Sequence, residues 1–348
     1  KGGGSDEAIR EEYQCLFVVF RNPRTRSIVY NYLIRRLLAM VPTLFFASII
    51  CFSVVRMVPG DILDLMLTEN DFGSGDPKTR ADLQVALGID KPIYVQYGVW
   101  ITGIVTRFDF GNSLWQNTPV IDDIVERLPT TFELGLLSLI IALIVAIPIG
   151  IYSAVRQETL WDYVGRTVSI LGLAVPSFWL GTMVVLLPAI WWGWSPPVEM
   201  VPFFEDPVGN LQVFIIPSMI LGFSLSAVTM RMTRTMMLEV LRQDYVRTAW
   251  AKGLKERVVV MRHALKNALI PVVTLIGLLV PILIGGTVII EQIFILPGMG
   301  QLLLDAVSSR DYPIITGVFL IIGIAVVFIN LAIDICYGFL DPKVRYDQ

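Results

Sequence analysis

The chain offers few side chains for catalysis or metal binding. Its 348 residues include one histidine, His263, and three widely separated cysteines, Cys15, Cys51 and Cys336. The chain therefore has too few histidines to favour a histidine-based metal site or a Ser-His-Asp triad. An odd number of distant cysteines favours small apolar fillers over a disulfide framework. We expect no catalytic, cofactor-binding or metal-binding residue in this chain.

The sequence also lacks the motifs expected for nucleotide binding. No G-x-x-x-x-G-K-[ST] stretch occurs, so the sequence contains no P-loop for ATP. Two DFG tripeptides, at residues 71–73 and 109–111, lack any kinase context and are interpreted as chance or turn residues. A membrane-embedded protease would need a Ser/His, Asp/Asp or HExxH constellation at membrane depth, and the sequence has none. If the chain belongs to a pump, its energy must come from another subunit.

Composition indicates an integral membrane protein. Hydrophobic residues make up 55% of the chain and charged residues 16%, whereas a soluble domain carries about a quarter charged residues. The net charge of −3 argues against a nucleic-acid partner. The partner it indicates is the lipid bilayer.

Six windows contain no charged side chain and are long enough to cross a bilayer. At about 1.5 Å per residue, about 20 helical residues cover an apolar core of about 30 Å, and backbone groups in lipid must be bonded internally. We therefore predict an all-α fold with six transmembrane helices. The windows are residues 37–55, 134–155, 167–198, 207–230, 267–290 and 312–333.

Some features of these windows need interpretation. The third has 32 residues, more than one span, and residues 191–194 are interpreted as its interfacial end. Residues 92–106 are apolar but too short to span and suit a helix lying on the membrane surface. Asp334, at the end of the sixth window, is expected to make a structural hydrogen bond to a neighbouring helix. Prolines inside spans act either as hinges or as static kinks. They are Pro148, Pro176, Pro188, Pro217 and Pro281.

The distribution of Lys and Arg sets the orientation. With six spans, both termini share a side with residues 156–166 and 231–266, and that side carries 20 basic against 12 acidic residues. The opposite side carries 7 against 18. The positive-inside rule places the first side in the cytoplasm. We therefore predict an N-terminal cytoplasmic extension at residues 1–32 and a six-helix domain at residues 33–348. That domain has an external loop at 56–133 and a cytoplasmic loop at 231–266.

The cytoplasmic loop 231–266 carries the most informative pattern. Residues 237–254 read as one helix with an apolar stripe, Gly253 is placed to end it, and Pro271 suits the first turn of the next span. The stripe consists of Leu238, Leu241, Tyr245 and Ala249. A helix held between two spans can be pushed or pulled by a partner. The alternative is a basic loop attracted to anionic lipid, and charge alone does not separate the two.

The amino-acid sequence of this loop resembles a known signature. Residues 244–254 read DYVRTAWAKGL and residues 262–272 read RHALKNALIPV. They are similar to the coupling loop of bacterial ABC importer permeases, and most of all to the dipeptide, oligopeptide and nickel permease family. Trp250 departs from the pattern, because relatives usually have Arg or another small or polar residue there. Further matching stretches run in order along the chain: VPGD (58–61), LGIDKPIYVQYGVWI (87–101), DFGNS (109–113), RLPTTFEL (127–134), AVPSFWLG (174–181), PGMGQLLLDAVSSRDYP (297–313) and LDPKVR (340–345).

The resemblance implies a fold and a set of partners. The fold is the ABC importer type I permease fold, in the cytoplasmic (inner) membrane of a bacterium or archaeon. The partners are a homologous second permease, two cytoplasmic ATPase subunits that bind ATP and Mg, and an extracytoplasmic binding protein. The coupling helix sits in a cleft of an ATPase subunit, and ATP binding turns the pore from inward-facing to outward-facing. The expected coupling residues are Asp244, Tyr245, Arg247, Thr248, Ala249, Lys252 and Gly253.

Several alternatives stay open. Asp244 and Arg247 are three residues apart and could pair with each other instead of with a partner. The external loop 56–133 is either a docking site for the binding protein or a solvated face. Peptides are the leading solute, and nickel chelates, glutathione or oligosaccharides are the alternatives. A stand-alone channel or secondary transporter would work without ATPase subunits.

Overall fold

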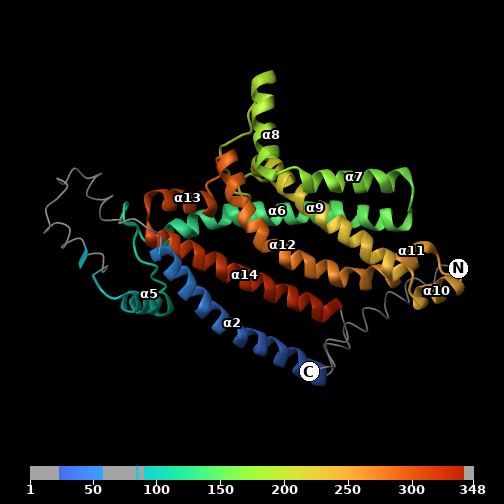
Figure 1. Ribbon diagram of the computed structural model, residues 1–348, viewed down its shortest axis with the longest axis horizontal. Coiled ribbons are helices and arrows are strands. Elements are labelled where there is room, and N and C mark those ends of the chain that lie inside the picture. The colour runs from blue at the N-terminus through green and yellow to red at the C-terminus, as the bar shows by residue number, and fades with distance from the viewer. Residues whose placement is uncertain (1–22, 58–83, 86–89, 341–348) are drawn as a thin grey trace.

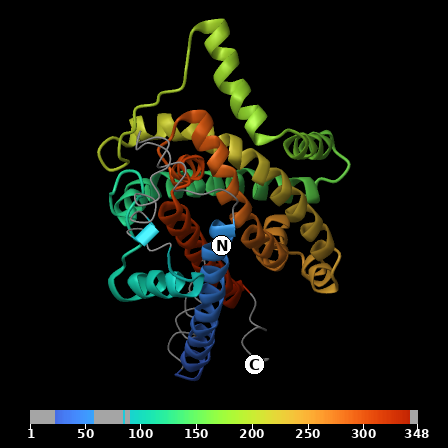
Figure 2. The ribbon, with the colours of Figure 1, turned by 60° about the vertical axis from the view of Figure 1, so that its left-hand side comes forward.

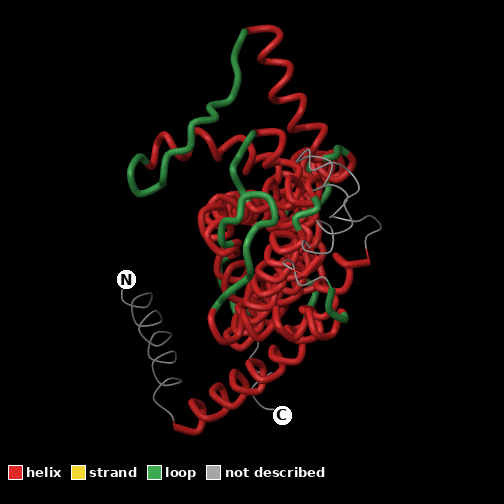
Figure 3. The backbone as a smooth tube through the Cα atoms, turned by 90° about the vertical axis from the view of Figure 1, so that its left-hand side faces the viewer, coloured by secondary structure: helices red, strands yellow, loops and turns green. Residues whose placement is uncertain are grey.

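The protein is built from helices. The computed structural model describes residues 23–57, 84–85 and 90–340, and Figure 3 shows helices joined by loops across these ranges. Within them the structure has no β-strand, and Asn112 and Pro119 form an isolated antiparallel bridge. The prediction of an all-α fold is confirmed.

Among the described residues, the structure has up to six helical candidates for membrane spans, one of them broken. Five helices are long and apolar enough to cross a bilayer by themselves: α2 (Pro23–Met57), α6 (Val120–Val155), α9 (Pro207–Leu241), α12 (Leu265–Phe294) and α14 (Tyr312–Leu340). The sixth candidate is the pair α7 (Leu160–Ala174) and α8 (Ser177–Trp192), whose halves meet at 92°. Six spans are therefore obtained when the bent pair is counted as one.

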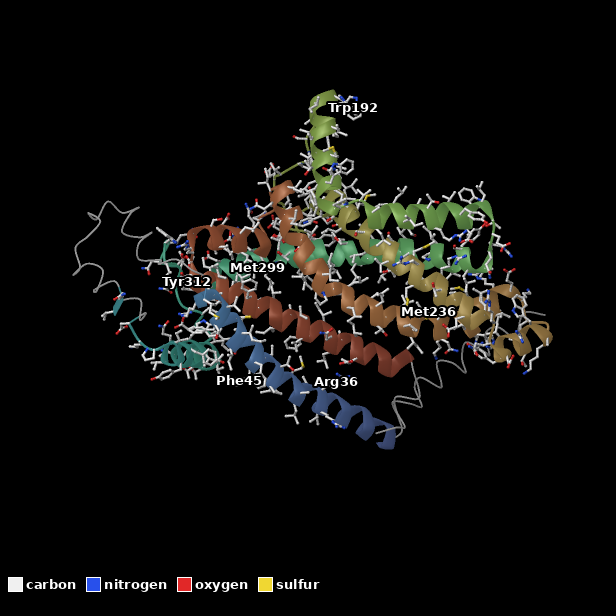
Figure 4. All side chains as sticks on the ribbon, viewed as in Figure 1. Arg36, Phe45, Trp192, Met236, Met299 and Tyr312 are labelled. Atoms are coloured by element: carbon white, nitrogen blue, oxygen red, sulfur yellow. The ribbon has the colours of Figure 1, made fainter. Side chains whose placement is uncertain are left out.

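The break corrects the expectation of a continuous third helix over residues 167–198. Pro176 restricts the residue before it to extended backbone, and Val175 has φ −88° and ψ 118°. The halves have 15 and 16 residues, about 22 and 24 Å, so neither covers a core of about 30 Å alone. Figures 1 and 2 show α8 standing away from the other helices, and Trp192 lies near its tip in Figure 4.

Three helices, α2, α6 and α9, extend well beyond the charge-free windows. α6 has 36 residues and α9 has 35, about 54 and 52 Å at 1.5 Å per residue. α6 begins at Val120, so the last part of the expected loop 56–133 is helical. Asp122 and Asp123 lie in its first turn, where the helix dipole favours negative charge. The windows stopped at the first charged residue, whereas the helices continue past it.

Close backbone approach holds α6 against α9. A Cβ atom added to Gly222 of α9 would lie 2.9 Å from the backbone oxygen of Ser138 in α6. A Cβ atom on Gly150 of α6 would lie 3.0 Å from the backbone oxygen of Met230 in α9. Small residues that let backbones approach in this way are typical of helix contacts in membranes. These contacts hold α6 against α9, the helix that leads into the loop 231–266.

α2 lies along α14 at the edge of the bundle (Figure 1). Arg36, labelled in Figure 4, forms an ion pair with Asp334 at 3.1 Å, so the expected interhelical bond of Asp334 takes the form of an ion pair. Residues 1–22 lie outside the described residues. Because α2 begins at Pro23, it runs through the expected domain boundary between residues 32 and 33, which stays a prediction.

The surface helix expected at residues 92–106 is present as α5 (Ile93–Arg107). Its Tyr97 hydroxyl makes a 2.8 Å hydrogen bond with the Ser48 hydroxyl of α2, and Trp100 packs on Phe52 of α2. Tyr94 is 76% exposed and Val105 72%. An apolar outer face on a short helix suits the membrane interface.

Candidate coupling site

The loop 231–266 forms a short helix between two long ones. α10 (Asp244–Ala251) follows α9 and is followed by α11 (Glu256–Val258), a π-helical segment (Val259–Ala264) and α12. In Figure 1, α10 and α11 lie together at the end of the bundle opposite α13 (Met299–Ser309). A helix tethered at both ends is the arrangement that the sequence predicted.

Backbone geometry defines both ends of α10. Gln243 is extended, with ψ 148°, and Asp244 lies in the first turn, where negative charge is favoured. At the other end Gly253 has φ +74°, and its N–H donates to the Trp250 carbonyl at 2.9 Å. L-residues rarely adopt this conformation, so glycine is favoured there. The prediction that Gly253 ends the helix is confirmed.

A small apolar cluster seats α10 on its neighbours. Val246 is fully buried, Ala249 is 5% exposed, and both belong to a cluster with Val259 of the π-helical segment. Val240 and Leu241, at the end of α9, pack against the same cluster. The cluster therefore packs α10 against the end of α9 and against the π-helical segment that leads into α12.

The opposite face of α10 is open to solvent. Asp244 Oδ1 and Arg247 Nη1 lie 3.4 Å apart, so these two residues form a local ion pair. The side chains of Asp244 and Arg247 are 96% and 72% exposed. Such an exposed pair is weak and can be exchanged for contacts to a partner. The exposed expected coupling residues are Asp244, Tyr245, Arg247, Thr248, Lys252 and Gly253. Their roles toward a partner stay predictions.

Two details of the predicted loop were wrong. The single helix over residues 237–254 is two helices, because Arg242 and Gln243 interrupt it and reset the register. Val246 therefore takes the buried place expected for Tyr245, which is 42% exposed and accepts a 2.7 Å hydrogen bond from the Asn267 amide. Ala249 is buried, in agreement with its predicted place on the apolar stripe, and its role in coupling stays a prediction.

The path into the next span is also unusual. The π-helical segment Val259–Ala264 precedes α12, and Pro271 lies inside α12 instead of in its first turn. π-Helical turns are rare and are frequently found at functional sites. Nothing in the spacing of the sequence predicted this one. It joins the seat of α10 to α12 without a loop.

At the other end of the bundle, distant motif stretches meet around two buried carboxylates. Glu291 of α12 is fully buried and accepts hydrogen bonds from the Thr131 hydroxyl at 2.7 Å and from the Gly300 N–H, also at 2.7 Å. The stretches RLPTTFEL and PGMGQ are thus joined at the start of α13. A Cβ atom on Gly300 would lie 2.5 Å from the Val288 Cα atom, so only glycine fits.

The second carboxylate, Asp311, fastens the stretch DFGNS. It is 2% exposed and accepts hydrogen bonds from the Ser113 hydroxyl at 2.6 Å and from the Leu114 N–H at 3.0 Å. Burial raises the pKa of Asp311, and the hydrogen bond from Ser113 opposes that rise. Gly111 has φ +86°, which agrees with the interpretation of residues 109–111 as turn residues. Residues 71–73 lie outside the described residues.

No metal-binding cluster is found in the part of the chain that the structure describes. Among those residues, no three His, Cys, Asp or Glu side chains are grouped to hold an ion. The described residues instead place a short exposed helix, α10, at one end of the bundle and a set of hydrogen-bonded loops at the other.

Comparison with known proteins identifies the family. Residues 146–346 match the family described as binding-protein-dependent transport system inner membrane component, and residues 29–135 match its N-terminal family. The chain belongs to this family. It is a multi-pass inner-membrane permease of the ABC transporter type. The coupling-loop stretch that carried the resemblance, residues 244–254, lies inside the first match.

Two relatives match this permease over nearly their whole length. The oligopeptide transport system permease protein AppB of Bacillus subtilis is 40% identical over 322 residues, covering 90% of this chain and 99% of the relative. The dipeptide transport system permease protein DppB of Escherichia coli K12 is 36% identical over 341 residues, covering 91% and 99%.

Proposed function

We propose that this permease is one half of the membrane pore of an ATP-driven importer of di- or oligopeptides. Peptide would arrive from an extracytoplasmic binding protein, and energy from two ATPase subunits would enter through α10. The observation that carries the proposal is α10 itself, which is seated through Val246 and Ala249 while its polar face is exposed.

The sequence supports the proposed ATPase partners. The chain has no P-loop, so ATP and Mg would be bound by the partner subunits. A helix held at both ends converts the movement of a partner into movement of α9 and α12. The exposed polar residues of α10, such as Arg247 and Lys252, supply the contacts such a partner needs.

The substrate class rests on the named relatives. Both AppB and DppB are named for peptide transport, and each is covered at 99% of its length. Nickel chelates, glutathione and oligosaccharides are the alternative solutes. Uptake measured with labelled dipeptide, oligopeptide and each alternative separates them.

A second permease subunit is part of the proposal. α8 carries large apolar side chains that other parts of the described chain leave open, including Trp179 at 50% exposure and Ile190 at 65%. A subunit that shares its pore with a homologous permease has such surface to cover. Both termini and α10 are assigned to the cytoplasm by the excess of Lys and Arg on that side.

The test uses the backbone requirement at Gly253. The permease is coexpressed with its operon neighbours, reconstituted in lipid nanodiscs, and assayed for ATPase association, ATP hydrolysis and peptide uptake. Gly253→Val forces a β-branched residue into the left-handed region, which costs about 1–2 kcal/mol and should displace the end of α10. Gly253→Asn tolerates that region and should stay close to wild type.

Gly193 supplies a matched control. It has φ +64°, and a Cβ atom there would meet nothing within 4 Å, as at Gly253. Gly193→Val therefore imposes the same local strain at the end of α8. The proposal expects loss of peptide-stimulated hydrolysis in Gly253→Val alone. It fails if wild type binds no ATPase, or if the two valine variants behave alike.

A further inference from the structure

The turn between α6 and α7 contains a buried ionic contact that reaches three helices. Asp162 of α7 is 1% exposed and forms a bidentate ion pair with Arg234 of α9. Arg234 Nε donates to Asp162 Oδ1 at 2.9 Å, and Arg234 Nη2 donates to Asp162 Oδ2 at 3.0 Å. The Ser153 hydroxyl of α6 also donates to Asp162 Oδ1. The Glu158 N–H, within the turn itself, donates to Oδ2 at 3.2 Å.

This contact lies close to α10 along the chain. Arg234 belongs to α9, which runs unbroken from there to Leu241, three residues before α10 begins. On the other side of α10, Glu256 pairs with Arg156 of the same turn at 3.2 Å. The α6–α7 turn therefore touches the chain both before and after α10.

The two arms of this contact differ in strength. The Arg156 and Glu256 side chains are 53% and 42% exposed, so water and salt screen their attraction. The Arg234 side chain is 19% exposed and faces a carboxylate with almost no access to water. Buried pairs with fork geometry hold a fixed orientation, and removing one partner leaves an uncompensated charge. The buried arm is therefore the rigid link.

α7 has the packing needed to move with α9. A Cβ atom on Gly172 would lie 2.9 Å from the Ala227 Cβ atom, and one on Gly165 would lie 3.0 Å from the Met230 Cε atom. Two close contacts and one ion pair thus fasten α7 along α9. α7 ends at the Pro176 break, beyond which α8 turns by 92°.

We propose that Asp162 is a positioning residue that transmits movement of α10, through Arg234 and α9, to the broken span α7–α8. This inference rests on the proposed coupling through α10 and adds the route by which it reaches the membrane. In this route α8, which projects furthest from the bundle, is the element moved (Figure 2). A contact that only stabilised the fold would leave the coupling between hydrolysis and α8 unchanged.

The test follows α8 directly in the full complex. Nitroxide labels are placed at residues 192 and 243, where Trp192 and Gln243 are exposed, after the native cysteines are replaced by serine. Pulsed electron spin resonance then measures the distance between labels with and without ATP. Wild type should show a distance change on ATP binding. Asp162→Asn should lose that change while the ATPase subunits remain bound.

A second readout is the number of ATP molecules hydrolysed per peptide transported. Asp162→Asn should raise this ratio by about fivefold or more, in the range of measured couplings between sites. Arg234→Lys keeps the charge but loses the fork, so it should raise the ratio as well, and it replaces Asp162→Asn if that variant does not fold. Glu256→Gln breaks the exposed arm and should change the ratio less.

The outcomes separate this inference from the proposed function. If wild type binds no ATPase, the proposed function fails. If wild type is coupled but its labels do not move with ATP, this inference alone is overturned. The same holds if the folded Asp162 and Arg234 variants transport at the wild-type ratio, or if Glu256→Gln has the larger effect.

Discussion

Replacing Glu291 by alanine should release the start of α13 from the bundle. Glu291 is fully buried and accepts three hydrogen bonds, from the Thr131 hydroxyl at 2.7 Å, the Gly300 N–H at 2.7 Å and the Gln301 N–H at 3.1 Å. The two N–H groups belong to the first turn of α13, where no carbonyl of the same helix can accept from them. Alanine leaves all three donors without this acceptor.

The size of the effect can be worked out from these contacts. A hydrogen bond to a charged group contributes about 1.5–3 kcal/mol, and because the three are not additive we take about 3 kcal/mol in total. With a factor of ten for each 1.4 kcal/mol, α13 should open about a hundredfold more often. Glu291→Gln keeps one carbonyl oxygen for the two N–H groups and should lose about 1 kcal/mol.

Hydrogen exchange of residues 299–309, followed by mass spectrometry in nanodiscs, measures this opening. Glu205→Ala is the matched control, because Glu205 is an exposed glutamate of the α8–α9 loop. The order of exchange rates should be Glu291→Ala, then Glu291→Gln, then wild type together with the control. If Glu291→Ala exchanges α13 at the wild-type rate, the carboxylate does not hold this helix and the reasoning is refuted.

Two further predictions concern other contacts. Gly222→Ala should lower the stability of the α6–α9 pair by about 1–3 kcal/mol, because the added methyl group overpacks a filled contact. Gly285→Ala is the control and should leave the stability unchanged, because a Cβ atom there meets nothing within 4 Å. Thermal unfolding of both variants checks this prediction. Asp311→Ala should free the Ser113 hydroxyl and the backbone of residues 112–116, with a loss of about 2–4 kcal/mol. Faster hydrogen exchange in that segment than in the exposed control Asp305→Ala supports it, and equal exchange contradicts it.

The sequence predicted the spans well because membrane helices are selected by a simple property. A charge-free window of sufficient length locates each crossing, and every window contains helical residues. It could not locate the ends of α6 and α9, because a helix can continue into water with charged residues on it. It also treated five prolines alike, although Pro148, Pro188, Pro217 and Pro281 lie inside helices whereas Pro176 marks the break.

The candidate site was predicted in part for a similar reason. Gly253 was found because positive φ has a local signature that only glycine satisfies readily. The inward turn of Val246 was missed because two residues, Arg242 and Gln243, reset the helical register. Contacts such as Thr131 with Glu291 and Asp162 with Arg234 join residues far apart in the chain. Periodicity carries no information about such pairs, although the matched motif stretches contained several of the residues.

The π-helical segment Val259–Ala264 has a consequence for how such permeases can diverge. A π-helical turn holds one residue more than an α-helical turn needs, so loss of a single codon there leaves an unbroken α-helix. That loss would rotate α10 and α11 by about 100° around the axis of α12, since each residue of an α-helix turns by that amount. α10 would then present a different face to the same partner. A single deletion could thus re-aim the helix without disturbing the six spans.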